Sequence, residues 1–314
     1  MKASDMTQTT ASSAFATWQR ERQRHFEWFA QSMSPVPGRE PKRLAGAMRY
    51  ALLGGGKRIR PLLCYAAGSV TGAPEAVLDR AALALEMIHS YSLVHDDMPA
   101  MDNDQLRRGK PTVHVQYGEA LAMLAGDALQ TEAFSVLSGA DAPAETVLRL
   151  VRTLSHASGF YGMAGGQALD LAMVGGHPTE AELLRMQTMK TGALIRAAVL
   201  MGAQAGDWTN LPDEGRSGLA LYSQALGLAF QVIDDILDCT QETAVLGKTA
   251  GKDEKDDKPT WVSILGLEGA KKKAEELRAE AQFGLDLVAK TEGLAPDATK
   301  RLGEIADYVL NRSF

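Results

Sequence analysis

Apolar residues recur with helical spacing through almost the whole chain, and this pattern limits the possible fold more than any other feature of the sequence. We find no series of alternating apolar and polar residues separated by hairpin turns, as an all-β or α/β chain would contain. Thr179 and Glu182 form a Thr-x-x-Glu pattern that caps helix starts. The clearest helical segments are 81–94, 144–156, 179–189, 219–239 and 269–289. The sequence therefore predicts an all-α protein.

Turn-forming residues divide these helices without marking a boundary between domains. The breaks include 54–56, 175–178 and 252–259, and no change of composition accompanies them. A chain of 314 residues is long enough for one large domain. We expect residues 1–314 to form a single bundle of about ten core helices, many of them apolar on all sides. About residues 1–15 should be frayed.

Composition and charge exclude several classes of protein. The 33 Lys and Arg residues against 39 Asp and Glu give a net charge of −6, which disfavours a protein that binds nucleic acid over its whole surface. No apolar stretch reaches the length of about 18 residues that a membrane span needs, and the N-terminus lacks the apolar segment of a secretion signal. Cys64 and Cys239 match no metal-binding spacing. We expect a cytoplasmic protein with no membrane insertion and no nucleic-acid partner.

Two clusters of aspartates lie next to apolar helical sequence. The first cluster is Asp96, Asp97 and Asp102, and the second is Asp234, Asp235 and Asp238. Asp234 and Asp238 are four residues apart, so they share a helix face. Each cluster alone fits a solvated charge patch. Two of them favour a divalent cation, because close carboxylates otherwise push one another toward protonation. Oxygen ligands favour Mg2+ or Mn2+ over Zn2+, and Mg2+ in such sites also binds substrate phosphate oxygens.

The first cluster has a longer spacing than the second. Pro99 lies between the Asp96 and Asp97 pair and Asp102, and proline cannot continue a regular helix without losing a hydrogen bond. The spacing predicts a local bulge that returns Asp102 to the metal-binding face.

Basic residues accompany the acidic clusters. Arginine binds phosphate with a two-pronged donor geometry, and lysine supplies a compact charge. Cations follow the triple glycine at 54–56 and also the first aspartate cluster; they are Lys57, Arg58, Arg60, Arg107, Arg108 and Lys110. The sequence therefore predicts a site for a phosphorylated substrate.

A nucleotide-binding P-loop is the alternative for Gly247, Lys248 and Thr249. That motif would need a glycine at position 242, which is Glu242, and a preceding strand. Neither requirement is met, so nucleotide binding of this kind is not expected.

Seven motifs carry a resemblance to a known family. They are GGGKRIRP, EMIHSYSLVHDDMPAMDNDQLRRGKPT, AGDALQ, GGQALDL, KTGALIRAA, LAFQVIDDILD and LGKTAGKD. In this order, between about Gly54 and Arg312, the chain resembles the short-chain trans-prenyl diphosphate synthases, most closely those of the bacterial farnesyl type. The resemblance implies the isoprenoid synthase fold, with core helices around a deep central cavity, and a homodimer.

The resemblance also implies roles for individual residues. Both aspartate clusters would hold three Mg2+ ions, which Mn2+ can replace, and these ions would bind the diphosphate of dimethylallyl or geranyl diphosphate. Further ligands of that diphosphate would be Arg107, Lys190, Lys248 and Lys258. Isopentenyl diphosphate would bind without metal to Lys57, Arg60, His89 and Arg108. Oxygen atoms facing a carbocation would belong to Thr191 and Gln231.

The implied chemistry is a condensation. The allylic C–O bond ionises, the double bond of isopentenyl diphosphate attacks the carbocation, and proton loss ends the step. The catalytic set is Asp96, Asp97, Asp102, Lys190, Thr191, Gln231, Asp234 and Lys248. Water must be excluded, so the polar segment 252–258 is a candidate closing loop, although a merely solvated connection is the alternative.

Residues just before the first cluster bear on product length. Tyr91 lies five residues before Asp96, and with Ser92 and Met87 it would form the floor under the prenyl tail. A bulky residue there resembles the chain stop of farnesyl synthases, which predicts a C15 product, although an aromatic residue on an apolar helix can also be ordinary core. Asn103 departs from close bacterial relatives, so geranylgeranyl or geranyl diphosphate synthase remains an alternative.

Three nearby features have open assignments. Gln105 stands where close bacterial relatives often carry Asp, as at position 103. Gln167 either faces the cavity or belongs to a motif whose Gly165 and Gly166 allow close helix approach. His95 is assigned to packing or to support of the neighbouring aspartates.

Two rival functions each fit part of the sequence. A terpene cyclase shares the fold and the first cluster, but its second motif reads (N/D)DxxSxxxE, unlike Asp234 to Asp238. A non-catalytic helical subunit of a prenyl synthase typically loses aspartates from one or both motifs, whereas this chain has both.

Overall fold

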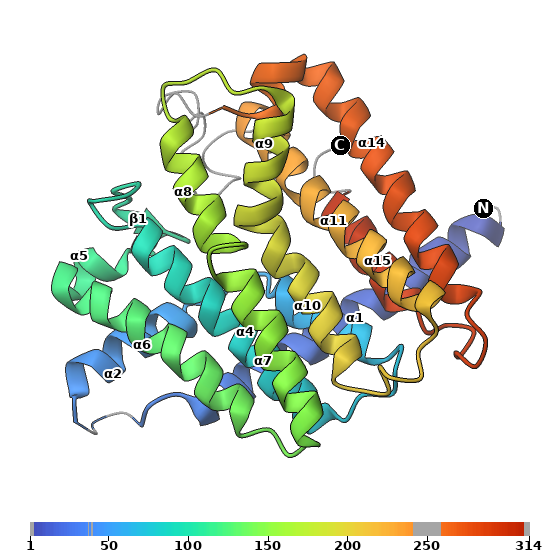
Figure 1. The fold of residues 1–314 in the computed structure, drawn as a ribbon, viewed down its shortest axis with the longest axis horizontal. Helices are drawn as coiled ribbons and strands as arrows, with labels where there is room; N and C mark the ends of the chain where they lie inside the picture. Colours follow the sequence, from blue (N-terminus) through green and yellow to red (C-terminus); the bar gives the residue numbers. More distant parts are fainter. Residues whose placement is uncertain (1–2, 37, 39, 241–258, 311–314) are drawn as a thin grey trace.

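The computed structural model describes residues 3–36, 38, 40–240 and 259–310 (Figure 1). In these ranges the protein is almost entirely helical, which confirms the all-α prediction. A small antiparallel hairpin is the exception, with β1 (Leu106–Arg107) paired to β2 (Lys110–Pro111). The helices are α1 (Ala3–Met33), α2 (Lys42–Leu52), α3 (Ile59–Gly68), α4 (Glu75–Asp96), α5 (Val113–Tyr117), α6 (Glu119–Ser138), α7 (Ala144–Ser158), α8 (Met163–Met173), α9 (Glu180–Gln187), the π-helix η1 (Thr188–Gly192), α10 (Ala193–Gln204), α11 (Asp213–Thr240), α14 (Trp261–Ala289) and α15 (Lys300–Leu310).

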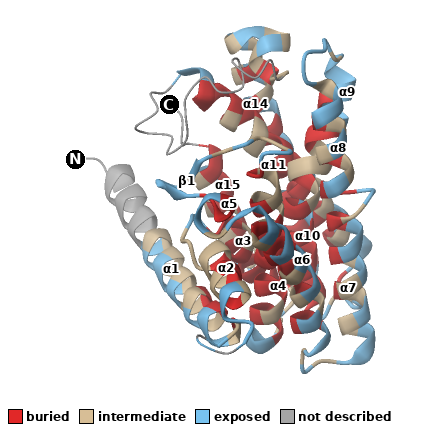
Figure 2. Ribbon diagram, turned by 90° about the vertical axis from the view of Figure 1, so that its left-hand side faces the viewer, coloured by how far each residue is buried: buried red, intermediate tan, exposed pale blue. Residues whose placement is uncertain are grey.

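Helices α3, α4 and α10 lie at the centre of the bundle, and most of their residues are buried (Figure 2). Residues 81–88 of α4 are buried on every side, because α3, α6 and α10 pack around this helix. The sequence of this stretch is rich in alanine and leucine all round, as a central helix requires. This composition does not show which face of α4 packs against which neighbouring helix.

Small residues let the central helices approach closely. A Cβ at Gly202 of α10 would lie 2.2 Å from the backbone oxygen of Cys64 in α3. A Cβ at Gly227 of α11 would lie 2.9 Å from the Cα of Gly192 in η1. These contacts are backbone against backbone, so no side-chain rearrangement relieves them. They fix the distance between the central helices and the segment that carries the candidate site.

Helices α11 and α14 pack against each other along one side of the bundle (Figure 1). Gly266, with φ of 71°, kinks α14 near its start. The C-terminal ends of α4 and α11 lie toward the same end of the bundle as η1 and α8 (Figure 1). Both aspartate clusters therefore come to that end.

The N-terminal helix packs on the outside of the bundle, against α3 and α4 (Figure 2). It begins at Ala3, so the described backbone is helical over most of the segment for which the sequence predicts fraying. Fraying of that end stays a prediction. Among the described residues, no helix combines the length and the apolar character needed to cross a bilayer.

Candidate active site

The first aspartate cluster lies where α4 ends. The helix stops at Asp96, and the chain then turns so that the backbone N–H of Asp102 donates to the carbonyl of Asp96 at 2.9 Å. The N–H of Asp104 likewise donates to the carbonyl of Asp97 at 3.1 Å. The predicted local bulge takes the form of a turn after the helix has ended. Pro99 lies in this turn, which folds the chain back and returns the backbone of Asp102 to that of Asp96.

Both aspartate clusters line one polar cavity of about 220 Å³. Its acidic wall residues are Asp96, Asp102, Asp104, Asp170, Asp234 and Asp235. Arg107 and Lys190 supply positive charge to the same walls. The described walls include neither Asp97 nor Asp238. The structure thus brings together four of the six aspartates assigned to metal and separates two.

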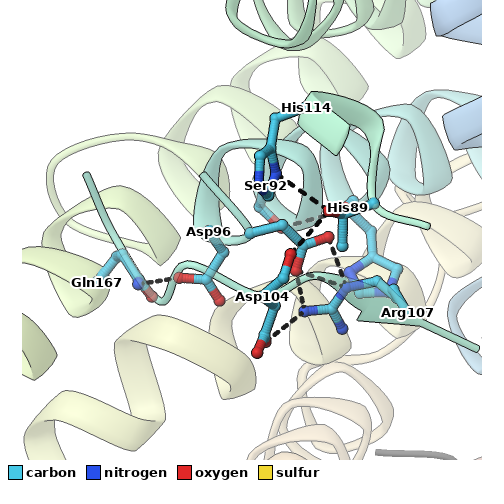
Figure 3. A network of polar contacts seen from close by, with 9 residues as sticks. His89, Ser92, Asp96, Asp104, Arg107, His114 and Gln167 are labelled. Carbon is cyan, nitrogen blue, oxygen red and sulfur yellow. Dashed lines mark hydrogen bonds and ion pairs between the residues drawn. The ribbon is translucent and has the colours of Figure 1, made fainter. Parts of the chain in front are cut away.

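Asp97 is turned toward Arg107 rather than into this cavity. The Nε of Arg107 lies 2.9 Å from both carboxylate oxygens of Asp97, and its Nη2 lies 2.5 Å from Oδ1. Nη2 also reaches Asp104 at 3.8 Å, and Figure 3 shows this network beside the carboxylate of Asp96. Burial raises the pKa of Asp97, and the hydrogen bonds from Arg107 oppose that rise. Asp97 therefore fixes the guanidinium of Arg107 at the cavity wall.

Asp235 is held from three directions. Its Oδ2 accepts the backbone N–H of Trp261 at 2.8 Å and Nε2 of Gln187 at 3.3 Å. Its Oδ1 accepts Nε2 of Gln231 at 3.1 Å. The indole N–H of Trp261 in turn donates to Gln187. Asp235 therefore ties α11 to α9 and to the start of α14.

Sequence reasoning assigned no role to Gln187 or Trp261. Gln187 lies three residues before the KTGALIRAA motif, and the need for a hydrogen-bond partner becomes evident only from its burial in the structure. Asp238 is buried, with 7% of its surface exposed.

The π-helix η1 carries Lys190 and Thr191. The Nζ of Lys190 lies 2.6 Å from Asp170 of α8, which keeps the ammonium group at the cavity. The hydroxyl of Thr191 donates to Oε1 of Gln231 at 3.0 Å. A Cβ at Gly166 would lie 2.1 Å from the backbone N of Lys190, so α8 can approach η1 only because this residue is glycine. A π-helical turn of this kind often occurs at functional sites.

Asp96 is also held from α8. The side-chain amide of Gln167 donates to Oδ1 of Asp96, as Figure 3 shows. Gln167 therefore faces the site. Close helix approach, the other assignment for its motif, holds for Gly166. Both explanations of the GGQ segment apply, each to a different residue.

Arg60 and Arg108 form a second cationic cluster, beside His89. Burial lowers the pKa of Arg60, and Arg108 lowers it further. The Nε of Arg60 is buried and has no hydrogen-bond partner among the described residues. A Cβ at Gly56 would lie 2.7 Å from the guanidinium carbon of Arg108, so this glycine, with φ of 132°, makes room for the cation. Clustered cations with an unsatisfied N–H suit an anion such as diphosphate.

Lys57, which the resemblance also assigns to isopentenyl diphosphate, is exposed and lies on the same segment as Arg60. Lys248 and Lys258, and the segment 252–258 proposed as a closing loop, lie outside the described residues.

A second cavity of about 350 Å³ extends from the acidic one. Asp96, Lys190 and Thr191 line both cavities, so the two adjoin. Tyr91 and Ser92 line the second cavity, together with apolar residues of α8. Its size and its largely apolar walls suit a hydrocarbon chain attached to a group bound in the acidic cavity.

His95 and Tyr91 pack together at this second cavity. Their rings meet edge to face with centroids 5.8 Å apart, and His95 Nε2 lies 3.0 Å from the backbone oxygen of Met123 in α6. A Cβ at Gly126 would collide with the His95 ring. Met87 is fully buried and does not line the described cavity walls. The structure thus places Tyr91 and Ser92, but not Met87, where a tail could touch them.

The acidic cavity fits Mg2+ by the chemistry of its donors. Its walls offer carboxylate oxygens and no thiolate, a set that suits hard divalent cations. Among the described residues, no three His, Cys, Asp or Glu side chains converge into a closed ligand cage. Carboxylates on separate walls suit ions whose other ligands are water and substrate oxygens.

An all-α bundle with acidic helix ends, a neighbouring cationic cluster and an adjoining cavity of mostly apolar surface is typical of enzymes that act on hydrocarbon diphosphates. Residues 41–286 match the model of the polyprenyl synthetase family. The protein belongs to the polyprenyl synthetase family, which confirms the resemblance drawn from its motifs.

Curated relatives agree with this assignment. The chain is 52% identical over 255 residues to a probable farnesyl diphosphate synthase of Sinorhizobium fredii, covering 81% of this chain and 74% of that one. It is 49% identical over 272 residues to the farnesyl diphosphate synthase of Escherichia coli, with 85% and 88% covered. Identity to the chloroplastic geranylgeranyl pyrophosphate synthase 3 of Arabidopsis thaliana is 45% over 284 residues, with 88% and 76% covered.

Solved structures share the fold. An FPP/GFPP synthase from Zymomonas mobilis, in its apo form, superposes with a TM-score of 0.82 at 37% identity and covers 95% of this chain and 99% of its own. A geranyltransferase from Helicobacter pylori, complexed with magnesium and isoprenyl diphosphate, superposes with a TM-score of 0.80 at 34% identity, with 94% and 96% covered. These likenesses confirm the isoprenoid synthase fold.

Proposed function

We propose that this protein is a prenyltransferase that condenses isopentenyl diphosphate with dimethylallyl and geranyl diphosphate to give farnesyl diphosphate. The observation that carries the proposal is that two cavities adjoin, one walled by both aspartate clusters and one of mostly apolar surface bordered by Tyr91. A diphosphate in the first cavity leaves its hydrocarbon chain in the second. Family membership and the two bacterial farnesyl synthase relatives support the same reaction.

The allylic diphosphate lies between the two aspartate clusters in this proposal. Asp96, Asp102 and Asp234 would hold Mg2+, which would neutralise the diphosphate and stabilise it as a leaving group. Arg107 and Lys190 donate to the same diphosphate from positions fixed by Asp97 and Asp170. Their charge is aimed at the group where negative charge develops as the C–O bond ionises.

The allylic cation is stabilised by oxygen atoms of Thr191 and Gln231. These side chains are hydrogen-bonded to each other in the wall of the acidic cavity, and Thr191 also lines the second cavity. Isopentenyl diphosphate binds to Arg60, His89, Arg108 and Lys57, which holds its double bond near the cation. New C–C bond formation is followed by loss of a proton, which the released diphosphate accepts.

A C15 product follows from the position of Tyr91. Its buried ring, supported by His95, closes the apolar cavity in this proposal. Geranylgeranyl diphosphate is the second candidate product, because Asn103 departs from the close bacterial pattern and a plant geranylgeranyl synthase is 45% identical. The higher identity to farnesyl synthases favours C15.

Three finer points complete the proposal. Three Mg2+ ions are bound, and Mn2+ substitutes for them. The enzyme works in the cytoplasm. It is a homodimer, for which exposed apolar side chains on α6 and α7 are the supporting observation: Met123, Leu124 and Leu148 are 49%, 51% and 58% exposed.

Condensation by the purified protein tests the enzyme assignment. Wild-type protein with isopentenyl and geranyl diphosphates and Mg2+ should release inorganic diphosphate, and EDTA should stop the release. Asp234→Asn should lower kcat by about 100-fold, since a group that acts in the transition state is lost. Asp141→Asn, at an exposed loop position, is the matched control and should behave as wild type. Absence of release by the wild type would leave a non-catalytic helical subunit as the better assignment.

A further inference from the structure

Arg58 stands between two residues of the isopentenyl diphosphate site, yet its own side chain is closed off from any ligand. Only 1% of that side chain is exposed. Lys57 next to it is exposed, and Arg60 lines the second cavity, the one assigned to the prenyl tail and called the tail cavity below. A buried guanidinium needs partners for its N–H groups and its charge. Those partners show what the residue does.

All three nitrogens of the Arg58 guanidinium are occupied by the protein. Nε donates to Glu27 of α1 at 2.7 Å, and Nη1 donates to Glu86 of α4 at 2.8 Å. Nη2 donates to the backbone oxygen of Leu52 at 2.8 Å. The guanidinium also lies over the ring of Phe26, with 5.3 Å to the centroid. Arg58 therefore joins α1, α4 and the end of α2.

The backbone of Arg58 explains why so many contacts converge there. Its φ of 51° and ψ of 39° are left-handed, a conformation that costs free energy for a residue other than glycine. The turn at Arg58 sets the direction of the backbone at Lys57 on one side and at the start of α3 on the other. Arg60 lies in the first turn of α3. A second contact from α1 fixes the same turn, since Nε2 of Gln23 donates to the backbone oxygen of Lys57 at 2.9 Å.

We infer that Arg58, anchored by Glu27 and supported by Gln23 of α1, is a positioning residue that holds Lys57 and Arg60 in register for isopentenyl diphosphate. This inference rests on the proposed function. It makes the outer helix α1 part of the second-substrate site, although its side chains do not line the described cavities. The carboxylates of Glu27 and Glu86 also offset the repulsion that gathers around Arg60 and Arg108.

The kinetic test separates the two substrates. Glu27→Gln and Gln23→Ala each remove one contact, and each should raise the KM for isopentenyl diphosphate, by about tenfold for the first and about threefold for the second. The KM for geranyl diphosphate and kcat should stay within about twofold. Arg58→Lys should resemble Glu27→Gln, because an ammonium group cannot serve three acceptors in the planar geometry of a guanidinium.

Arg22→Gln is the matched control. Arg22 also joins α1 to α4, through Glu75 at 2.5 Å, but this ion pair is partly exposed and lies away from the turn. This variant should keep the wild-type KM for both substrates. The side chain of Glu27 is 36% exposed, so its replacement should leave the protein folded. Glu27→Gln and Gln23→Ala therefore decide the outcome if Arg58→Lys fails to fold.

Two results would overturn the inference while the proposed function stands. One is an unchanged KM for isopentenyl diphosphate in Glu27→Gln and Gln23→Ala with an active wild type. The other is an equal rise in the KM of both substrates, which indicates a general structural role. An inactive wild type would instead overturn the proposed function.

Discussion

Asp96 and Asp97 are neighbours in the sequence whose carboxylates have different surroundings. Asp96 faces the acidic cavity and accepts Gln167, whereas Asp97 is buried against Arg107. Both were predicted to bind metal. Their spacing along a helix does not tell which of two adjacent carboxylates will pair with an arginine instead. That arginine comes from a hairpin after α4, so the distinction depends on tertiary structure.

The two aspartates should differ in what their loss does. Asp97→Asn should lower the free energy of unfolding by about 2–4 kcal/mol, because it breaks a buried ion pair. Asp96→Asn should cost less than about 1 kcal/mol in stability but about 100-fold in kcat. Urea unfolding and steady-state kinetics on both variants check this. Equal loss of activity without loss of stability in Asp97→Asn would show that both aspartates are metal ligands.

Replacing Tyr91 tests whether this residue closes the end of the tail cavity. Tyr91→Ala removes a ring that borders the apolar cavity, so a longer tail should fit and the main product should shift from C15 toward C20 or beyond. Chromatographic sizing of the hydrolysed products measures the shift. An unchanged C15 product would discard Tyr91 as the residue that stops elongation.

His89 should give the stability of the free enzyme a dependence on pH. Burial first, and then Arg60 and Arg108, hold the pKa of His89 well below 6.5. Arg107 and Arg58 act in the same direction. The unfolded chain takes up a proton as pH falls through about 6.5, whereas the folded protein does not. The unfolded state then binds more protons, so stability is lost as pH falls.

The His89 effect is measured against His89→Gln. Between pH 7.5 and 5.5 the wild type should lose more unfolding free energy than the variant, by at most about 1.4 kcal/mol per pH unit below 6.5. Inorganic diphosphate should shrink the difference, since an anion beside His89 favours its protonation. Identical pH profiles for the two proteins would contradict the lowered pKa.

At the scale of elements, the helices follow from sequence more closely than the connections between them. The Thr179 and Glu182 pair forms the predicted capping box, with the backbone N–H of Glu182 bonded to the hydroxyl of Thr179 at 3.3 Å. The periodic segments 81–94 and 144–156 lie within α4 and α7. The path of the chain after α4 could not be predicted as closely, because Pro99 is compatible with both a bulge and a turn. Backbone hydrogen bonds from residues beyond Pro99 favour the turn.

The π-helix η1 had no sequence signal. Its register depends on two close backbone contacts, Gly166 from α8 and Gly227 from α11, and each becomes visible only when the helices are packed. Lys190 and Thr191 owe their placement to these contacts. The helical segment predicted over 179–189 ends just before Lys190 and Thr191, inside the π-helix, and so did not place either side chain.

Gly166→Ala tests this element directly. The added methyl group would meet the backbone of Lys190, so η1 or α8 must move, and kcat/KM should fall by about 10- to 100-fold. Gly303→Ala in α15 is the control, because its Cβ would lie 3.6 Å from Leu285, an ordinary contact. Unchanged kinetics in Gly166→Ala would show that the position of Lys190 does not depend on this contact.

At the scale of the molecule, the meeting of the two aspartate clusters is what converts separate motifs into a site. Residue patterns predicted that each cluster binds a cation and that a phosphorylated substrate lies between them. A substrate that bridges the clusters requires them to converge, but the helix packing that brings them together could not be predicted, because no local pattern gives the packing of α4 against its neighbours. The net charge of −6 is likewise a property of the whole chain that does not reveal clusters of opposite sign at one end of the bundle.

The most direct measurement is the chain length made by the purified wild-type enzyme. Isopentenyl diphosphate is supplied in excess over geranyl diphosphate with Mg2+, and the products are dephosphorylated and sized by gas chromatography with mass spectrometry. We predict farnesol as the dominant product, with little C20 alcohol. A dominant C20 product would contradict the farnesyl assignment, and the absence of any condensation would contradict the proposed reaction itself.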